Sequence, residues 1–534
     1  MAFLLALLMP PAGAQPLKGV VWAVPASLEQ AEEDLIRMHR AGVEAVRTGL
    51  IREERLLALA DTLGLQLFQE LPLDYLPARL LADTLAYARR TLQAAWRRSR
   101  EHPSARHFGL ARRSDTSHPA ACAFFRSLAT ALPDTAGVHL YYVSAFPDRD
   151  RCRDAVDFVL FDALDRLPPL PLGPRAGLAT LGARVEAGAP PGLRNPHTPE
   201  AQARFLENHL ATLLDARPAP VAVFVHRWRD AGPGEGGPEP PDPYRRRYGL
   251  HDAGGRARLA FDVVAGLYTG RQRVFALPLG RPARPEVPWL RLLGWTVLTL
   301  IGLHYAASPR FRFMIPRYFL AHTFYCEAIR EGRDVLPLAS GLLLLAVAAS
   351  VGMTAAVVLE AYREHAAVIA WLYWLPPALR EVVAGLLAQP WLVVLLAGSL
   401  YVLALSLWAA LLALMARRRR ALTPGQTFMM VAWPRWTFLL LMLAAMVLAG
   451  NPPDDVRAAA PLLVVAWLGL TLLALLRTLL DFAHVTRSAP GHIVAVGLAN
   501  PLFVLGLPAV VLLPLLFGPW LEFFRHLLLG ALTL

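Results

Sequence analysis

Hydrophobic positions divide the chain into two parts with different patterns. Up to about residue 285, short apolar runs alternate with longer amphipathic stretches and with turns rich in Pro and Gly. From about residue 288 onward, the apolar runs lengthen to the roughly 20 residues that a membrane-spanning helix needs. This change of pattern predicts a soluble domain followed by an all-α polytopic membrane domain over residues 288–534.

The first part is predicted to consist of repeated βα units. The β-branched run at 20–24 predicts a strand, and Ser27 is placed to cap a helix over 28–41. Eight strands are expected, at 20–24, 43–48, 65–70, 105–110, 138–144, 157–161, 178–182 and 221–227, before a last helix over 256–268. Eight such units in about 250 residues are typical of a (β/α)8 TIM barrel, although a doubly wound sheet uses the same units.

The second part is predicted to contain about six transmembrane helices. The candidate spans are 288–307, 338–360, 391–415, 436–450, 459–482 and 493–518. Arginines gather after the first and third spans, where Arg417 to Arg420 form a continuous run, whereas the loop after the fourth is acidic. Because positively charged loops stay in the cytoplasm, residues up to about 285 are expected outside it. Arg477 and Asp481, near the end of the fifth span, are either part of a polar pathway or a simple ion pair.

The N-terminus gives an independent indication of export. Residues 1–14 form an apolar run that ends in small residues, as in a secretory signal peptide, with an uncleaved anchor as the alternative. The predicted organisation is therefore a signal peptide or anchor over 1–14, a barrel over 16–270, a linker over 271–287 and the membrane domain. The expected location is a bacterial-type inner (cytoplasmic) membrane, crossed several times, with the barrel outside the cytoplasm.

Composition and motifs exclude several classes of function. Hydrophobic residues make up 55% and charged residues 18%, which excludes a wholly soluble or disordered chain, and a nucleic-acid partner is not expected despite the net charge of +12. No His-Glu-x-x-His, Cys-x-x-Cys or phosphate-binding loop occurs, so neither a metal nor a cofactor is expected. Three cysteines are too few for a disulfide scaffold. Cys122 and Cys152 are expected to be separate thiols, with a bridge as the alternative.

Several segments, taken in order, carry a resemblance to a known family. They are residues 34–48 (DLIRMHRAGVEAVRT), 59–72 (LADTLGLQLFQELP), 102–104 (HPS), 224–230 (FVHRWRD) and 248–256. This series resembles the catalytic barrel of glycoside hydrolase family 2, the β-galactosidase and β-glucuronidase group. The resemblance covers about residues 20–270. It implies a TIM barrel that handles carbohydrate, with its site at the C-terminal ends of the strands.

The resemblance also identifies positions for the catalytic groups. A retaining glycosidase needs one carboxyl as acid/base and a second as nucleophile. The family's acid/base belongs to an Asn-Glu pair that ends the fourth strand, and here that pair is replaced by Arg112 and Arg113. A guanidinium stays protonated and cannot donate and retake a proton at working pH. Asp115 lies two residues further on, and Glu186 matches the family's nucleophile in one of two possible registers.

Four further residues are candidates for substrate binding. Arg47 and Glu70 match family positions after the second and third strands, and ion-pair scaffolding is the alternative role for both. Trp228 and Asp230 follow the eighth strand, where an aromatic platform with a polar partner can hold a sugar ring, and plain packing is the alternative for the tryptophan.

The sequence therefore predicts a membrane-anchored, extracytoplasmic, glycoside-hydrolase-like barrel that binds or processes carbohydrate. Classical retaining hydrolysis is not expected because Arg113 occupies the acid/base position, while an inverting scheme with Asp115, Asp148, Asp162 or Glu186 stays open. One alternative is a non-catalytic carbohydrate sensor that signals to the membrane helices. Another is a transporter or envelope-assembly protein with an accessory barrel. The expected partners are a glycan and membrane lipid, and the sequence does not indicate an oligomeric state.

Overall fold

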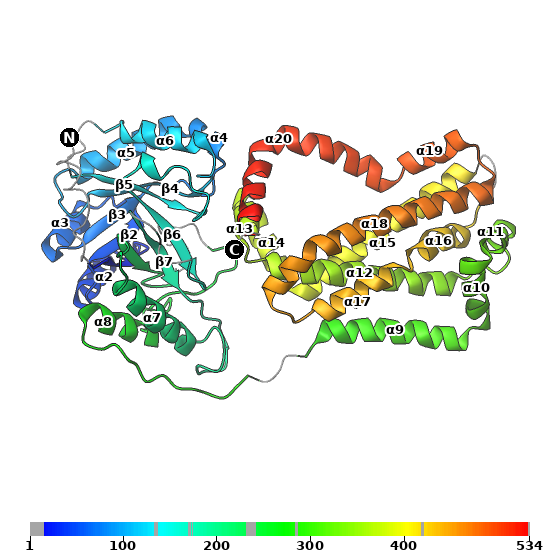
Figure 1. The fold of residues 1–534 in the computed structure, drawn as a ribbon, viewed down its shortest axis with the longest axis horizontal. Helices are drawn as coiled ribbons and strands as arrows, with labels where there is room; N and C mark the ends of the chain where they lie inside the picture. The colour runs from blue at the N-terminus through cyan, green and yellow to red at the C-terminus, as the bar shows by residue number, and fades with distance from the viewer. Residues whose placement is uncertain are drawn as a thin grey trace. The chain divides into compact units, whose positions relative to one another are not determined.

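A computed structural model describes residues 15–531, apart from 133–136, 169–171, 173–174, 231–241, 284–286 and 418–420. The predicted signal peptide or anchor over 1–14 lies outside the described residues, as do three of the four arginines at 417–420. The chain forms two compact units (Figure 1). The first contains residues up to Pro285 and again from Pro519 onward, and the second contains Glu286–Gly518.

The first unit is built on a closed barrel of eight parallel strands in the order β1 to β8. This finding confirms the predicted eight-stranded barrel and excludes the doubly wound sheet. The strands are β1 Leu17–Val21, β2 Ala45–Gly49, β3 Gln66–Glu70, β4 His107–Ser114, β5 His139–Ser144, β6 Phe158–Leu164, β7 Ala176–Gly182 and β8 Ala222–Val225.

Helices surround the strands (Figure 1), and apolar residues fill the space on both sides of the sheet. Ser27 caps the first helix as predicted, because its side chain accepts a hydrogen bond from the backbone N–H of Gln30. Inside the barrel, rings such as Phe68 and Phe224 pack together with 4.9 Å between their centroids. The helices are α2 Leu28–Arg40, α3 Glu54–Leu63, α4 Ala78–Asp83, α5 Leu85–Ser99, α6 Pro119–Ala129, η1 Arg153–Ala155, α7 Pro199–Leu214 and α8 Leu259–Thr269.

Cys122 and Cys152 form a disulfide, so the prediction of separate thiols is wrong. Cys122 lies in α6, which follows β4, and Cys152 directly precedes η1, which follows β5. Because β4 and β5 are neighbours in the barrel, these two connections run side by side and bring the Cα atoms within 4.7 Å. A sequence separation of 30 residues alone does not reveal this contact.

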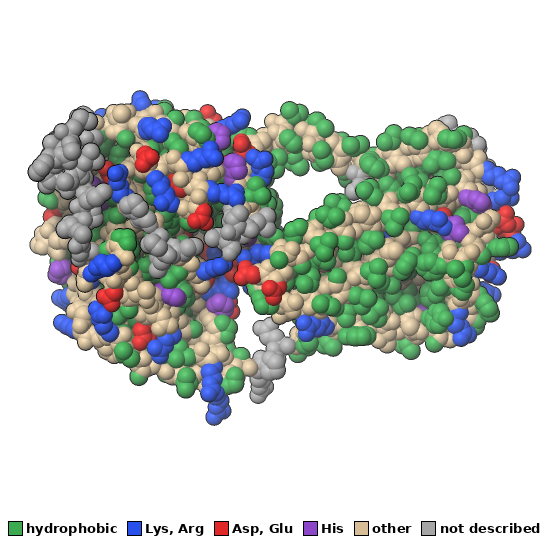
Figure 2. Space-filling model, viewed as in Figure 1, with side chains coloured by type: hydrophobic (Ala, Val, Ile, Leu, Met, Phe, Trp, Pro, Cys, Tyr) green, Lys and Arg blue, Asp and Glu red, His purple; other side chains and the backbone are tan. Residues whose placement is uncertain are grey.

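The second unit is entirely helical over its described residues. Figure 2 shows apolar side chains over most of its visible face, whereas the barrel unit presents a mixture of charged, polar and apolar groups. The helices are α9 Trp289–Ala307, α10 Pro309–Leu320, α11 His322–Glu331, α12 Pro337–Tyr362, α13 Ala366–Trp374, α14 Pro377–Leu387, α15 Pro390–Ala416, α16 Pro424–Ala432, η2 Trp433–Arg435, α17 Phe438–Leu448, α18 Pro453–Thr486, α19 Pro490–Leu498 and α20 Pro501–Ala531, whose end belongs to the first unit.

Among the described residues, five helices are long and apolar enough to cross a membrane: α9, α12, α15, α18 and the Phe503–Leu529 part of α20. The fourth predicted span corresponds to α17, which has only 11 residues. It passes the same test only together with α16 and η2, from which it is bent by 49°, giving up to six spans. Helix α20 is interrupted at Phe517, which has non-helical backbone angles.

Candidate functional site

In a parallel βα barrel, the loops after the strands meet at one end, and this end carries the active sites of TIM-barrel enzymes. We call this end the barrel mouth. Glu70 is the last residue of β3, Arg112 and Arg113 lie near the end of β4, and Asp162 lies in the second half of β6. The barrel thus brings these polar residues to the same end of the molecule, as the sequence predicts for Glu70 and for the two arginines.

A fully buried ion pair joins Arg47 on β2 to Glu70 on β3. The Arg47 Nε and Nη2 atoms lie 2.7 and 3.0 Å from the two carboxylate oxygens, and Nη1 donates to the carbonyl of Ala179 at 2.9 Å. Gly109 on β4 makes room for this pair, since a Cβ atom there would lie 2.7 Å from Glu70 Cγ. Neither charged side chain has exposed surface. This geometry favours the scaffolding role for Arg47 and Glu70.

Arg112 extends the ion pair toward the loop after β3. Its Nη1 lies 3.3 Å from Glu70 Oε2, and its Nη2 lies 2.6 Å from Asp74 Oδ2. Burial raises the pKa of Asp74, although the positive charge of Arg112 acts in the opposite direction. The second oxygen, Oδ1, is buried without a hydrogen-bond partner among the described residues. Asp74 is therefore a carboxyl at the barrel mouth that can hold a proton, and sequence reasoning missed it.

Arg113 occupies the position that the sequence resemblance assigns to the acid/base. Its guanidinium forms two hydrogen bonds with Asp162, at 2.5 and 3.2 Å, and Thr180 donates to the same carboxylate at 2.8 Å. The pairing of β4 with β5 shifts register around Arg112, and Arg113 has a φ of +51°. Such irregularities redirect side chains at barrel rims. Here the side chain reaches β6, and its guanidinium lies 5.6 Å from the centre of the Tyr75 ring.

Asp115, the predicted weak acid candidate, is buried beneath the C-terminal end of the chain. It accepts a hydrogen bond from Ser117 at 2.5 Å, and its other oxygen lies 3.1 Å from Nδ1 of His526. In the same segment, the ring of Phe523 is fully buried and contacts Phe146 in the loop after β5. Residues 519–531 thus cover the β4 and β5 side of the barrel mouth, a contact for which the sequence gives no signal.

Glu186, the predicted nucleophile candidate, lies in the loop after β7. Its side chain is 56% exposed, and its nearest cation is Arg184, with 3.5 Å between Arg184 Nε and the carboxylate. The backbone N–H of Glu186 donates to the carbonyl of His197. The partners of Glu186 and those of Asp115 come from different loops, and neither carboxyl contacts the other. The structure therefore does not assemble these two residues into a catalytic pair.

Trp228 and Asp230 stabilise the segment after β8. The Trp228 ring is buried against His251 and Phe261, so it offers no exposed face to a sugar in this structure. Asp230 accepts hydrogen bonds from the backbone N–H of Tyr248 and of the next residue, and forms an ion pair with Arg258 at 2.5 Å. Both side chains hold the 248–258 loop in place.

The carboxylates on strands β3 and β6 and in the loop after β3 share one feature: each faces a guanidinium. Glu70 faces Arg47, Asp74 faces Arg112, and Asp162 faces Arg113. A guanidinium beside a carboxylate donates charge-assisted hydrogen bonds to it, so each of these carboxylates has a fixed partner at the barrel mouth. Asp162 and Asp74 keep 25% and 16% of their side-chain surface exposed, so an incoming polar ligand can reach them.

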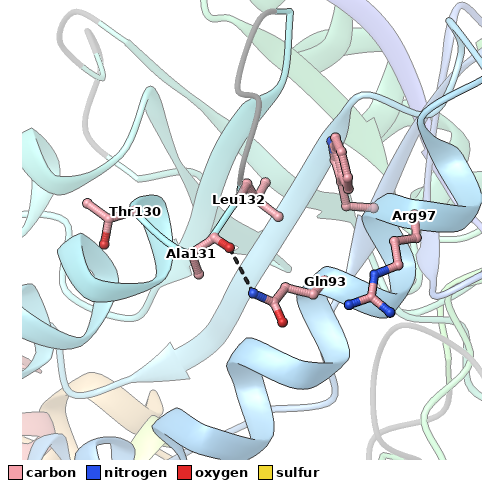
Figure 3. A pocket seen from close by; sticks show the side chains of 6 residues that line it. Gln93, Arg97, Thr130, Ala131 and Leu132 are labelled. Carbon is pink, nitrogen blue, oxygen red and sulfur yellow. Dashed lines mark hydrogen bonds between the residues drawn. The ribbon is translucent and has the colours of Figure 1, made fainter.

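A separate surface cavity of about 210 Å³ lies between α5 and the loop after α6 (Figure 3). It is lined by Gln93, Trp96, Arg97, Thr130, Ala131 and Leu132, and Gln93 donates a hydrogen bond across it to the carbonyl of Ala131. Both lining segments lead into the N-terminal ends of strands. This cavity therefore lies at the end of the barrel opposite the mouth.

No family model and no curated protein matches the sequence. Among solved structures, the chain is similar to a GH2 β-galacturonidase from Eisenbergiella tayi bound to galacturonate (15% identity, TM-score 0.40, covering 49% of this chain and 52% of that one). It is also similar to a Faecalibacterium prausnitzii β-glucuronidase (17% identity, TM-score 0.41, covering 49% and 50%). A third is the Ruminococcus gnavus β-glucuronidase in complex with D-glucaro 1,5-lactone (13% identity, TM-score 0.39, covering 48% and 50%). The chain spans about half the length of these proteins.

Proposed function

We propose that the chain is a membrane protein whose N-terminal barrel binds carbohydrate at its mouth without performing retaining glycoside hydrolysis. The ordered series of glycosidase-like segments supports the carbohydrate class, and three of these segments contain most of β2, all of β3 and part of β8 of the closed barrel. The single observation that carries the proposal is the Arg113–Asp162 pair at the end of β4. The required proton donor is replaced by a permanently charged group that is held by its own counter-ion.

The chemistry of this replacement supports the absence of retaining hydrolysis. General acid–base catalysis contributes typically about 10²–10⁴-fold to the rate, and a guanidinium, which stays protonated at working pH, supplies none of it. By contrast, an arginine and a carboxylate side by side offer both donors and acceptors to sugar hydroxyls. Asp162 and Asp74, the partly exposed members of this network, are the groups that we assign to ligand binding.

Several features support a membrane location with the barrel outside the cytoplasm. Leucines with more than half of their surface exposed are frequent on α15 and α18, for example Leu395 at 58% and Leu462 at 73%, and a water-soluble surface rarely tolerates such patches. The Cys122–Cys152 disulfide is of the kind that forms in oxidising compartments. We therefore retain the organisation into an N-terminal signal or anchor (1–14), barrel (16–270), linker (271–287) and a multi-pass membrane domain that begins at 288, while the part of its predicted range from Pro519 onward joins the barrel unit.

A carbohydrate sensor is the second candidate, and the C-terminal segment favours it. Residues 519–531 form the last part of α20 and contact the barrel through Phe523 and His526. A ligand that enters the mouth near Asp115 has to compete with this segment or bind beside it. Because residues 519–531 belong to the same helix, α20, as residues of the helical unit, a ligand that displaces them can change the position of that helix.

The experiment that tests the proposal uses the full chain in detergent micelles, because residues from both ends of the sequence form the barrel unit. A panel of aryl glycosides is assayed for turnover, and free sugars are assayed for thermal stabilisation under the same conditions. We expect a sugar that stabilises the protein and no turnover. Turnover that disappears in Asp74→Asn or Glu186→Gln, but persists in the surface variant Asp215→Asn, would show that the barrel is an enzyme with a relocated acid.

A further inference from the structure

The second unit contains a cluster of three different metal-ligating side chains: the partly buried His322 and the buried Cys326 on α11, and the buried Asp481 on α18. One potential ligand atom of each lies within 4.8 Å of the others. The His322 Nε2 and Cys326 Sγ atoms lie 2.7 and 3.9 Å from Asp481 Oδ1. The spacing of four residues places the histidine and the cysteine on the same face of one helix turn.

In this cluster, both ring nitrogens of His322 face oxygen atoms that accept hydrogen bonds, but a neutral histidine carries only one ring proton. The Nδ1 atom of His322 lies 2.9 Å from the carbonyl of Tyr318, which can only accept, so the ring proton belongs on Nδ1. Its Nε2 atom then directs a lone pair at a carboxylate oxygen. Two acceptors at 2.7 Å require an extra proton between them, and a metal ion can take the place of this proton once the two atoms move apart. A backbone carbonyl on the second ring nitrogen is the usual way in which proteins orient a metal-binding histidine.

An independent observation comes from the second oxygen of Asp481. The side chain is only 1% exposed, yet Oδ2 has no hydrogen-bond partner among the described residues. An unpaired buried carboxylate oxygen costs free energy that a bound cation would recover. Arg477 compensates the charge in part, because its Nε lies 3.5 Å from Oδ1. Its side chain is 37% exposed, so it can turn outward when another cation binds.

From this geometry we infer that His322, Cys326 and Asp481 form a binding site for a divalent transition-metal ion of the zinc class. Imidazole, thiolate and carboxylate together are the ligand types of zinc, whereas magnesium and calcium prefer oxygen alone. Bond lengths of about 2.0–2.3 Å in a tetrahedron place ligand atoms roughly 3.3–3.7 Å apart. The observed separations of 2.7 and 3.9 Å reach these values through side-chain shifts below about 1 Å. Such an ion would tie α11 to α18, and water or another small ligand would complete its coordination.

The site is tested on the full chain, carried on a tag without histidine and purified in detergent without reductant or chelator. Metal content is measured by mass spectrometry, and Co²⁺ is titrated as a spectroscopic probe of the zinc site. Because Cys122 and Cys152 are joined in a disulfide, a thiolate-to-cobalt charge-transfer band can come only from Cys326. We expect this band in the unsubstituted protein, displacement of cobalt by zinc, and loss of the band in Cys326→Ser.

His322→Ala and Asp481→Asn are expected to weaken zinc binding by at least about tenfold to a hundredfold. The matched control is His484→Ala, which removes an exposed histidine one turn further along α18 and should change nothing. Elution volume and helical circular dichroism confirm that each variant is folded. Absence of the charge-transfer band in the folded, unsubstituted protein would show that the cluster is an internal ion pair only and would overturn the proposal. Zinc binding that survives all three substitutions would overturn it equally.

Discussion

Replacing Glu70 with glutamine tests how strongly the buried ion pair holds the barrel mouth together. In the structure this carboxylate receives two hydrogen bonds from Arg47, one from Arg112 and one from Tyr141. Glutamine keeps the size of the side chain but removes the negative charge. Arg112 retains Asp74 as its counter-ion, whereas the fully buried guanidinium of Arg47 loses its carboxylate counter-ion and keeps its hydrogen bond to the neutral carbonyl of Ala179.

Removing one partner of a buried ion pair costs about 3–5 kcal/mol, because the other charge is left uncompensated. For a domain of this size, about 1 kcal/mol corresponds to about 2–4 °C in melting temperature, so the expected loss is roughly 6–20 °C. The assay is thermal unfolding of the full chain in micelles, followed by tryptophan fluorescence. Trp22, which is buried in the barrel, contributes to this signal.

Two further variants make the result interpretable. Asp215→Asn breaks an exposed ion pair with Arg273 and should cost no more than about 1 kcal/mol. The double variant Arg47→Met, Glu70→Leu removes both buried charges and should recover part of the loss. If Glu70→Gln melts no lower than Asp215→Asn, the buried pair does not stabilise the barrel, and the reasoning is refuted.

Three other predictions concern the same unit. Substituting Cys122 by Ser opens a loop of 30 residues and should destabilise the protein by about 3–4 kcal/mol. Chemical reduction of the unsubstituted protein should cost the same free energy of unfolding, and reductant should have no further effect on the variant. Burial, with a smaller contribution from a second histidine, lowers the pKa of His107 from 6.5 to about 3, so the native state keeps it neutral. The free energy of unfolding should therefore fall as pH drops below 6.5 toward 3, by up to about 1.4 kcal/mol per pH unit. His107→Gln should flatten this slope in thermal melts, and an unchanged slope would exclude His107 as its cause. Phe523→Ala should release the C-terminal segment and raise its hydrogen exchange, whereas the exposed Leu528→Ala should not; equal exchange in both variants would mean that the segment is not held by Phe523.

The barrel could be predicted from the sequence because its strands are short, apolar and evenly spaced. The predicted strand at 65–70 is observed at Gln66–Glu70, and the one at 178–182 ends at the same residue as β7. Each βα repeat carries its own local sequence signal, such as the Ser27 cap of α2. The spans at 288–307 and 391–415 correspond closely to α9 and α15 for the same reason.

The partners of the site residues could not be predicted, because they depend on contacts between distant strands. Arg113 occupies the predicted position, but its pairing with Asp162 requires the register shift in β4 and a positive φ. Asp74 lies just beyond a predicted strand, and only its burial distinguishes it from an ordinary loop carboxylate. The sixth predicted span ends at residue 518, and no sequence signal beyond it indicates that Phe523 packs on the barrel.

We propose that the barrel mouth binds carbohydrate through the Asp162 network and does not hydrolyse it. The most direct test is the affinity of the full chain for the stabilising sugar, measured by calorimetry together with chromatographic analysis of the sugar after incubation. The account predicts that the unsubstituted protein and Asp215→Asn bind equally, that Asp162→Asn binds at least about tenfold more weakly, and that the sugar is recovered intact. Cleavage of the sugar, or unchanged affinity in Asp162→Asn, would contradict it.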